Sequence, residues 1–188
     1  MKYIKSCLKN LSGSETEKNL LQTFAGESRA SNKYMLYAEK AIQEGYVYVA
    51  QIFQETSNNE KAHSRRIYHD FLKQINTTKD NLETAMKGEE LESDELYKEF
   101  EETARKEGFD EIAEFYKELR EVEENHKKRF ASLRDRILSD TMFASPREEY
   151  WQCMNCGYIH IGLEAPEVCP LCNYPKSYFK IECKDYNL

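Results

Sequence analysis

The sequence has little proline and little glycine, and the prolines are unevenly placed. Only four Pro and seven Gly occur among 188 residues, too few for a collagen-like or low-complexity chain. No proline precedes Pro146, and the rest of the prolines follow it closely. A stretch from residue 14 to about residue 138 without proline is free of the residue that most strongly breaks helices.

Long apolar runs and an excess of positive charge are also lacking. No stretch approaches the roughly 18 apolar residues of a membrane span, and residues 1–13 contain no uninterrupted apolar core of a signal peptide. We therefore expect a cytoplasmic protein without a membrane partner. The net charge of −7 argues against a nucleic-acid partner.

Six cysteines occur in the sequence. Cytosolic thiols stay reduced, so metal ligands or free thiols are a better interpretation than disulfides. Four of the cysteines are spaced as metal ligands. Cys7 and Cys183 have no partner at such spacing, and we interpret them as free thiols.

Four long helices are predicted in the first part of the chain. A capping box, Ser14-Glu15-Thr16-Glu17, starts the first helix. Gly45 and Gly108 stand where the first and third helices should end, and a polar linker is expected at residues 76–80. Helices joined mostly by short turns predict an all-α, up-down four-helix bundle over residues 1–138. The expected helices span residues 14–44, 47–75, 81–107 and 110–138.

The helical region contains an internal repeat with an offset of 63 residues. Tyr34 matches Tyr97, and Glu44-Gly45-Tyr46 matches Glu107-Gly108-Phe109. The first two helices therefore look like a copy of the last two. A bundle with a pseudo-two-fold axis would bring equivalent residues together at its centre.

Each predicted helix has an apolar stripe that ionisable residues interrupt near its middle. Burying five carboxylates without compensation would cost more than the roughly 5–15 kcal/mol of net stability that a domain has. Two divalent metal ions would supply four positive charges against five negative ones. Oxygen and imidazole ligands suit iron or manganese, so two such ions are predicted. The seven inward-facing residues are Glu27, Glu60, His63, Glu89, Glu92, Glu123 and His126.

The position of one predicted ligand depends on the offset of the repeat. An offset of 63 pairs Glu27 with Glu90, whereas the two Gly-Glu pairs match at an offset of 62 and favour Glu89. We assign Glu89, because it continues the apolar seam and lies one turn from Glu92. Two core aromatics near the same layer, able to hydrogen-bond a ligand, are Tyr34 and Tyr97.

A second metal site is predicted near the C-terminal end. Cys153-x-x-Cys156 and Cys169-Pro170-x-Cys172 form two knuckles separated by 12 residues. Four thiolates make a tetrahedral site for zinc or iron, and the spacing does not decide between these metals. We expect a linker at residues 139–149 and a second domain at residues 150–188, which is too short to bury an adequate core without the metal.

Together these motifs resemble the rubrerythrin family over nearly the whole chain. The resemblance implies a ferritin-like di-iron four-helix bundle followed by a small rubredoxin-like β domain with an Fe(Cys)₄ centre, and hence three Fe per chain. The matching segments are Phe24-Ala25-Gly26-Glu27-Ser28, Glu60-x-x-His63, Gly88-Glu89-x-x-Glu92, Glu123-x-x-His126, Trp151-x-Cys153-x-x-Cys156-Gly157-Tyr158 and Ala165-Pro166-Glu167-x-Cys169-Pro170-x-Cys172.

The resemblance also implies an activity, a peroxidase of the NADH peroxidase type that reduces hydrogen peroxide to water and protects against oxidative stress. Tyr34 and Tyr97 would assist proton delivery. The implied ligand roles are bridging for Glu60 and Glu123, terminal for Glu27 and Glu89, ligation of the second iron for His126, and exchange of Glu92 for His63 when the first iron is reduced.

The tail site would pass electrons to the iron pair one at a time. By the same resemblance, a homodimer would place the tail of one chain near the bundle of the other. The donor would be a separate reductase or rubredoxin fed by NADH, because the chain has no Gly-x-Gly-x-x-Gly dinucleotide fingerprint.

Two other interpretations stay open. A ferroxidase or iron-storage protein would use the same bundle, although a redox tail would then have no obvious purpose. A non-enzymatic bundle with a zinc ribbon for partner binding would be colourless, whereas an iron–thiolate protein is red and bleaches on reduction.

Overall fold

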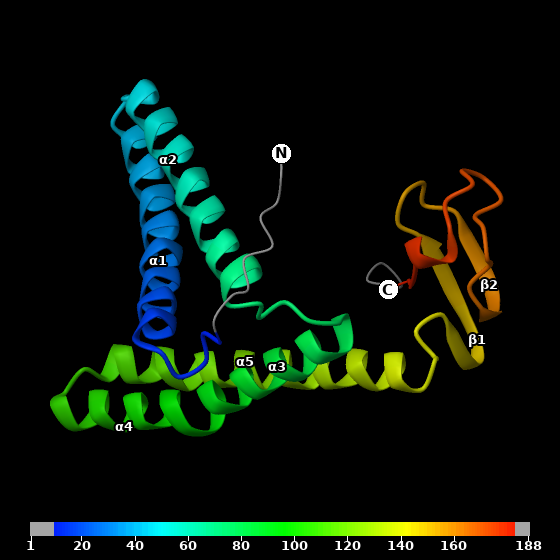
Figure 1. The fold of residues 1–188 in the computed structure, drawn as a ribbon. Helices are drawn as coiled ribbons and strands as arrows, with labels where there is room; N and C mark the ends of the chain where they lie inside the picture. The colour runs from blue at the N-terminus through cyan, green and yellow to red at the C-terminus, as the bar shows by residue number, and fades with distance from the viewer. Residues whose placement is uncertain (1–9, 183–188) are drawn as a thin grey trace. The chain divides into compact units, whose positions relative to one another are not determined.

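The computed structural model describes residues 10–182, which are mostly helical with a small sheet near the C-terminal end (Figure 1). The chain divides into two compact units, residues 1–76 and 77–188, each with its own internal packing. Cys7 and Cys183 lie outside the described residues. Among residues 10–182, no helix has the length and apolar character needed to span a bilayer.

The first unit is a helical hairpin of α1 (Glu15–Gln43) and α2 (Val47–Arg66), whose helices pack along their length (Figure 1). The predicted cap is confirmed, because the Ser14 hydroxyl accepts a hydrogen bond from the Glu17 backbone N–H at 3.1 Å. Gly45 makes the turn at φ 84°, a left-handed conformation that glycine adopts at little cost.

The second predicted helix is shorter in the structure than expected. After α2, the chain continues as a π-helical segment, η1 (Ile67–Phe71), in which the Leu72 N–H donates to the Ile67 carbonyl at 2.9 Å. The expectation of a helix to residue 75 is therefore wrong at its C-terminal end. Tyr68 of η1 stacks on Phe24 of α1 with ring centroids 4.6 Å apart, so this end of the hairpin closes on an aromatic pair.

The helices of the second unit form another hairpin, and its first arm contains a π-turn. That arm begins at Thr78 rather than Asn81, because Thr77 caps it by accepting from the Asp80 N–H at 3.2 Å. Gly108 closes the arm at φ 85°, as predicted. The elements are α3 (Thr78–Leu91), the π-turn η2 (Glu92–Leu96), α4 (Tyr97–Glu107) and α5 (Asp110–Leu138).

Small side chains are buried near the turn of each hairpin. Ala50 is 2% exposed and its repeat equivalent Ala113 is fully buried, so the backbones approach closely there. Two larger apolar residues, one turn of helix or less from these alanines, stay exposed within their hairpins. Val49 is 45% exposed and its equivalent Ile112 is 49% exposed. Each hairpin by itself therefore leaves a broad apolar face uncovered.

The C-terminal part is a three-stranded antiparallel sheet in the order β2-β1-β3, which confirms the small β domain. Trp151 is its largest buried side chain and donates from its indole N–H to the Gly162 carbonyl at 2.9 Å. Trp151 packs with Cys153, Cys169 and Phe179. The elements are β1 (Ala144–Cys153), β2 (Ile159–Glu164), the short 3₁₀ helix η3 (Lys176–Tyr178) and β3 (Phe179–Ile181).

Strand β1 starts inside the segment expected to be a linker. Ala144 pairs with Glu164, and an irregularity in the register separates this pair from the one at Glu149. Arg136 of α5 donates to the Thr141 carbonyl at 3.0 Å and holds the short connection that precedes the strand. The division into domains at residues 138 and 150 stays a prediction.

Candidate metal centres

The first hairpin brings three of the predicted ligands together. Glu60 and His63 lie one turn apart on α2, and Glu27 faces them from α1. Ligand atoms of all three lie within 4.8 Å of one another. His63 Nδ1 is 2.9 Å from Glu60 Oε2 and 3.5 Å from Glu27 Oε2. Two carboxylates and an imidazole that converge in this way are a donor set for a transition metal.

The second hairpin repeats this arrangement. Glu123 and His126 lie one turn apart on α5, and Glu89 faces them from α3, again with ligand atoms within 4.8 Å. His126 Nδ1 is 2.8 Å from Glu123 Oε2 and 3.7 Å from Glu89 Oε2. The structure groups Glu89, and not Glu90, with the Glu-x-x-His pair.

Without a cation, each triad must arrange protons among crowded acids. Hydrogen bonding to Glu60, together with partial burial, raises the pKa of Glu27, and hydrogen bonds from Glu27 and His63 lower the pKa of Glu60. The carboxylates of Glu60 and Glu27 raise the pKa of His63. Burial, followed by hydrogen bonding to Glu123, raises the pKa of Glu89. A metal ion would replace these shared protons, so both triads fit a cation.

Glu92 lies outside the second triad and pairs with a tyrosine instead. It is the first residue of the π-turn, and its Oε2 accepts a hydrogen bond from the Tyr97 hydroxyl at 3.1 Å. Burial, then this bond, raises the pKa of Tyr97 to about 12. Tyr97 thus contacts a predicted ligand, as the sequence suggested.

Tyr34, the equivalent of Tyr97, shares its aromatic neighbours but differs from it at the position of the carboxylate. Its ring centroid lies 6.2 Å from those of both Tyr37 and Phe53. The Tyr97 ring lies in the same way 6.1 Å from Phe100 and 5.8 Å from Tyr116. Alanine, at position 30, stands where an offset of 62 places the counterpart of Glu92. The first hairpin therefore offers no carboxylate at that place, and the tyrosines of the two hairpins are not equivalent.

The π-turn explains the two offsets in the repeat. Gly26 and Gly88 are 62 residues apart, whereas Tyr34 and Tyr97 are 63 residues apart. One extra residue must lie between Gly88 and Tyr97, and η2 is the place where the helix accommodates it. The change of offset was the available signal for this π-turn, and sequence reasoning did not use it.

The four predicted cysteine ligands meet in the C-terminal sheet domain. The Sγ atoms of Cys153 and Cys172 are 3.7 Å apart, and those of Cys156 and Cys169 are 3.6 Å apart. All four lie within 4.8 Å of one another. A tetrahedral metal with bonds of about 2.3 Å holds its sulfurs roughly 3.8 Å apart, whereas a disulfide requires about 2.05 Å. The spacing fits a metal and not disulfides.

Hydrogen bonds to sulfur make the two knuckles unequal. The side chain of Asn155, followed by the Tyr174 N–H, lowers the pKa of Cys172 to about 6. The hydrogen bond from the Tyr158 N–H lowers the pKa of Cys156. Burial and the neighbouring thiols outweigh it and raise this pKa to about 12. Four thiolates therefore do not coexist near neutral pH without a cation. Sequence reasoning missed Asn155, whose role depends on folding one knuckle over the other.

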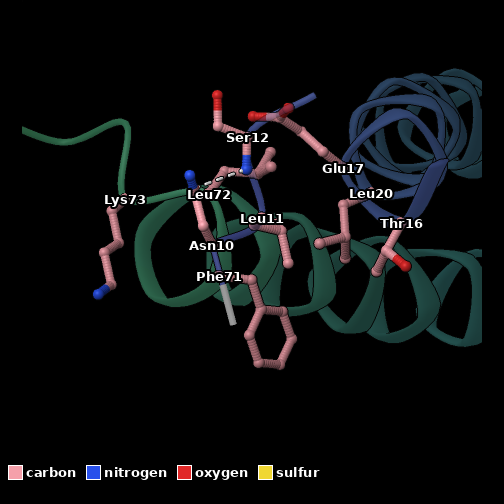
Figure 2. A pocket seen from close by; sticks show the side chains of 9 residues that line it. All are labelled: Asn10, Leu11, Ser12, Thr16, Glu17, Leu20, Phe71, Leu72 and Lys73. Carbon is pink, nitrogen blue, oxygen red and sulfur yellow. Dashed lines mark hydrogen bonds between the residues drawn. The ribbon is translucent and has the colours of Figure 1, made fainter. Parts of the chain in front are cut away.

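A cavity of about 540 Å³ lies where the start of α1 meets the end of η1 (Figure 2). Its lining includes Leu11, Leu20 and Leu72, and Figure 2 shows Glu17 and Lys73 on opposite sides. None of the predicted metal ligands lines this cavity, so it is separate from the proposed chemistry.

These features define a class of protein, a helical carboxylate–histidine metal protein that also carries a four-cysteine rubredoxin-like site. The family model for rubrerythrin matches residues 18–134, and the model for the rubrerythrin rubredoxin-like domain matches residues 151–180. The chain belongs to the rubrerythrin family, an oxidoreductase family with a ferritin-like di-iron domain and a rubredoxin-like domain.

Curated relatives support the same membership over nearly the full chain. Rubrerythrin-1 of Clostridium acetobutylicum is 38% identical, with 95% of this chain and 100% of the relative covered. Rubrerythrin of Porphyromonas gingivalis is 39% identical, with 92% of each covered. Rubrerythrin of Nitratidesulfovibrio vulgaris is 38% identical, with 93% and 97% covered.

Proposed function

We propose that this protein is a cytoplasmic non-haem di-iron peroxidase that reduces hydrogen peroxide to water. The observation that carries the proposal is the pair of equivalent Glu/Glu/His triads, one on each hairpin. Each triad supplies two carboxylates and one imidazole, and Glu92 adds a fifth carboxylate close by. Two iron ions would neutralise most of this charge.

The two triads would act as one centre if the hairpins combine into a four-helix bundle. The half-exposed residues Val49 and Ile112 support this association, because burying their remaining area would contribute about half of the roughly 1.5–3 kcal/mol that full burial of such a side chain provides. In the proposed centre, Glu60 and Glu123 would be the carboxylates shared by both metal ions. The remaining proposed ligands are Glu27 and Glu89 as terminal carboxylates, His126 on the second iron, and Glu92 or His63 on the first.

Reduction of peroxide to two waters needs two electrons and two protons. Ferrous ions, when bound, would supply the electrons for cleavage of the O–O bond. The chain's own residues handle the protons. Tyr97 keeps its proton at neutral pH, because its pKa is raised to about 12, and its hydroxyl is held against Glu92. It is thus placed to donate a hydrogen bond to a peroxide oxygen that binds beside Glu92.

The cysteine site would refill the helical centre with electrons. Cys153 and Cys169 are buried, whereas Cys156 and Cys172 are partly exposed, so electrons would enter and leave on the side of the partly exposed pair. The proposed donor is a reductase or rubredoxin that draws on NADH. A homodimer would bring the tail of one chain to the helices of another.

Metal analysis of protein purified without oxygen, with an assay of NADH-dependent peroxide reduction through a reductase, tests the proposal. We expect two Fe in the helices and one in the tail, a red colour that bleaches on reduction, and repeated turnover. A colourless protein with stoichiometric zinc would contradict the electron-transfer role, since zinc fits the same sulfur spacing. Iron accumulation without repeated turnover would indicate a ferroxidase.

A further inference from the structure

Tyr97 and Glu92 face each other only because of the π-turn. Residues five apart on a continuous α-helix point about 140° away from each other. In η2, the Tyr97 N–H donates to the Glu92 carbonyl, whereas an α-helix would direct it to Ser93. The five-residue step thus becomes one full turn, and the Tyr97 hydroxyl reaches the Glu92 carboxylate at 3.1 Å.

The rearranged turn leaves the Ser93 carbonyl without its α-helical partner. Ser93 is only 2% exposed, and a buried carbonyl that lacks a partner is destabilising. Arg120 of α5 supplies one, since its Nε donates to the Ser93 carbonyl at 2.9 Å. Its Nη1 donates to Glu101 of α4 at 3.1 Å, so the guanidinium joins the π-turn to the helix that follows it.

A second cation of α5 holds the next residue of the turn. Lys127 Nζ lies 3.3 Å from the Asp94 carboxylate. Arg120 and Lys127 stand one turn before and one turn after Glu123 on α5. The helix that carries the Glu-x-x-His ligands therefore also binds the π-turn, through one hydrogen bond and one ion pair.

The first hairpin makes the equivalent contact with a much shorter side chain. Ser57 is the repeat equivalent of Arg120, and Ser31 is the equivalent of Ser93 at the offset of 62. The Ser57 hydroxyl donates to the Ser31 carbonyl at 2.8 Å, and Ser57 is 3% exposed. The same carbonyl is thus bonded from the facing helix in both hairpins, by serine beside a regular helix and by arginine beside a π-turn.

We propose that Arg120 is a positioning residue that holds the π-turn and thereby sets Glu92 against Tyr97 beside the second triad. The importance of this placement for a bound metal rests on the proposed function. The turn itself does not, because its hydrogen bonds join only residues of the chain. A cavity of about 280 Å³ borders Arg120 and Ser93, so water can reach the carbonyl when the guanidinium is removed, and the hairpin should still fold.

The test compares Arg120→Met with Arg105→Met in the full-length protein. Arg105 also bonds Glu101, at 3.1 Å, but does not contact the π-turn, so it is a matched control. In metal-free protein, we expect Arg120→Met to speed hydrogen exchange of the Ser93–Lys98 amides about fivefold. Arg105→Met should leave these amides unchanged.

Co²⁺ titration supplies the second measurement, because cobalt bound to thiolates absorbs far more strongly than cobalt bound to oxygen and nitrogen. We expect Arg120→Met to weaken the carboxylate–histidine site about tenfold and to leave the thiolate site unaltered. Arg105→Met should weaken neither site. Unchanged exchange or unchanged cobalt affinity in Arg120→Met overturns the proposal.

Should Arg120→Met fail to fold, Arg120→Lys replaces it. A single ammonium cannot reproduce both bonds of the guanidinium fork, so smaller shifts in the same direction are expected, and their absence again overturns the proposal. If the wild-type protein binds cobalt only through thiolates, the proposed di-iron function fails. The exchange rates of the metal-free protein then still report on the Arg120 clamp.

Discussion

The two helical hairpins carry the same triad but surround it differently. The first has a regular helix before Tyr34, a Ser57–Ser31 contact and Ala30 at the position equivalent to Glu92. The second has a π-turn, an Arg120 clamp and a tyrosine bonded to Glu92. The ligand atoms that would hold the metals are thus repeated, while the carboxylate that would add asymmetry belongs to one hairpin. The repeat can therefore supply equivalent metal ligands in both hairpins, while Glu92 makes the two proposed metal positions chemically different.

The largest effect should come from removing a carboxylate of the triads, which both hairpins share. Glu60→Ala and Glu123→Ala each delete a carboxylate that we propose bridges the metals. Loss of a ligand exceeds the tenfold to hundredfold cost of losing an outer partner, so peroxide turnover should fall at least about a hundredfold in both. Rates measured under identical metal loading check this. The exposed Glu118→Ala on α5 is the control, and near-normal turnover in either ligand variant would refute the di-iron assignment.

A smaller effect is expected from removing Glu92, which only the second hairpin has. Glu92→Ala should weaken Co²⁺ binding by the helical site about tenfold, because one of five nearby carboxylates is lost while both triads stay intact. Glu92→Gln keeps an acceptor for the Tyr97 hydroxyl and separates the hydrogen bond from the charge. Equal affinity in wild type and Glu92→Ala would show that the fifth carboxylate does not act on the metals.

Replacing each tyrosine with phenylalanine should change the thermal stability of the protein by different amounts, because only Tyr97 donates a hydrogen bond to Glu92. Tyr97→Phe removes a hydrogen bond worth about 1 kcal/mol, which for a chain of this size lowers the Tm by roughly 2–4 °C. Tyr34→Phe keeps its ring contacts and should leave the Tm nearly unchanged. Thermal melts of the metal-free proteins measure both, and equal shifts would mean that the Tyr97–Glu92 bond contributes nothing.

The smallest effect concerns pH and the first hairpin. Glu60, then Glu27, raises the pKa of His63 in the folded protein. A raised pKa stabilises the folded state fully below the unfolded value of about 6.5, and that stabilisation is lost as the pH rises through the folded value. The Tm of the metal-free protein should therefore decline over this window. His63→Gln should reduce the decline, and an identical slope in the variant would count against the interaction.

Much of the fold could be predicted because its signals are local. The capping box at Ser14, the left-handed turns at Gly45 and Gly108 and the cysteine knuckles each depend on residues close in sequence. The grouping of each triad also follows from short spacings, a Glu-x-x-His step on one helix and a facing carboxylate on its neighbour.

The features that escaped prediction depend on contacts between distant residues. The start of β1 at Ala144 requires pairing with Glu164, far along the chain. The roles of Arg120 and Asn155 follow from partners that only the folded hairpin and the folded knuckles bring near. The π-helical segments η1 and η2 lie within runs whose apolar spacing is close to that of an α-helix, so periodicity alone did not reveal them. The joining of the two triads stays a prediction.

The unequal offsets of the repeat indicate the sequence in which a duplication and a change in length would have occurred. Gly26 and Gly88 are 62 residues apart, whereas Tyr34 and Tyr97 are 63 apart, so the two hairpins differ in length by one residue between these positions. If the two hairpins arose by duplication of one ancestral hairpin, the change in length followed the duplication. A residue gained or lost earlier would have been copied into both hairpins. The asymmetry that Glu92 and Tyr97 give to the proposed metal site would thus be younger than the repeat itself.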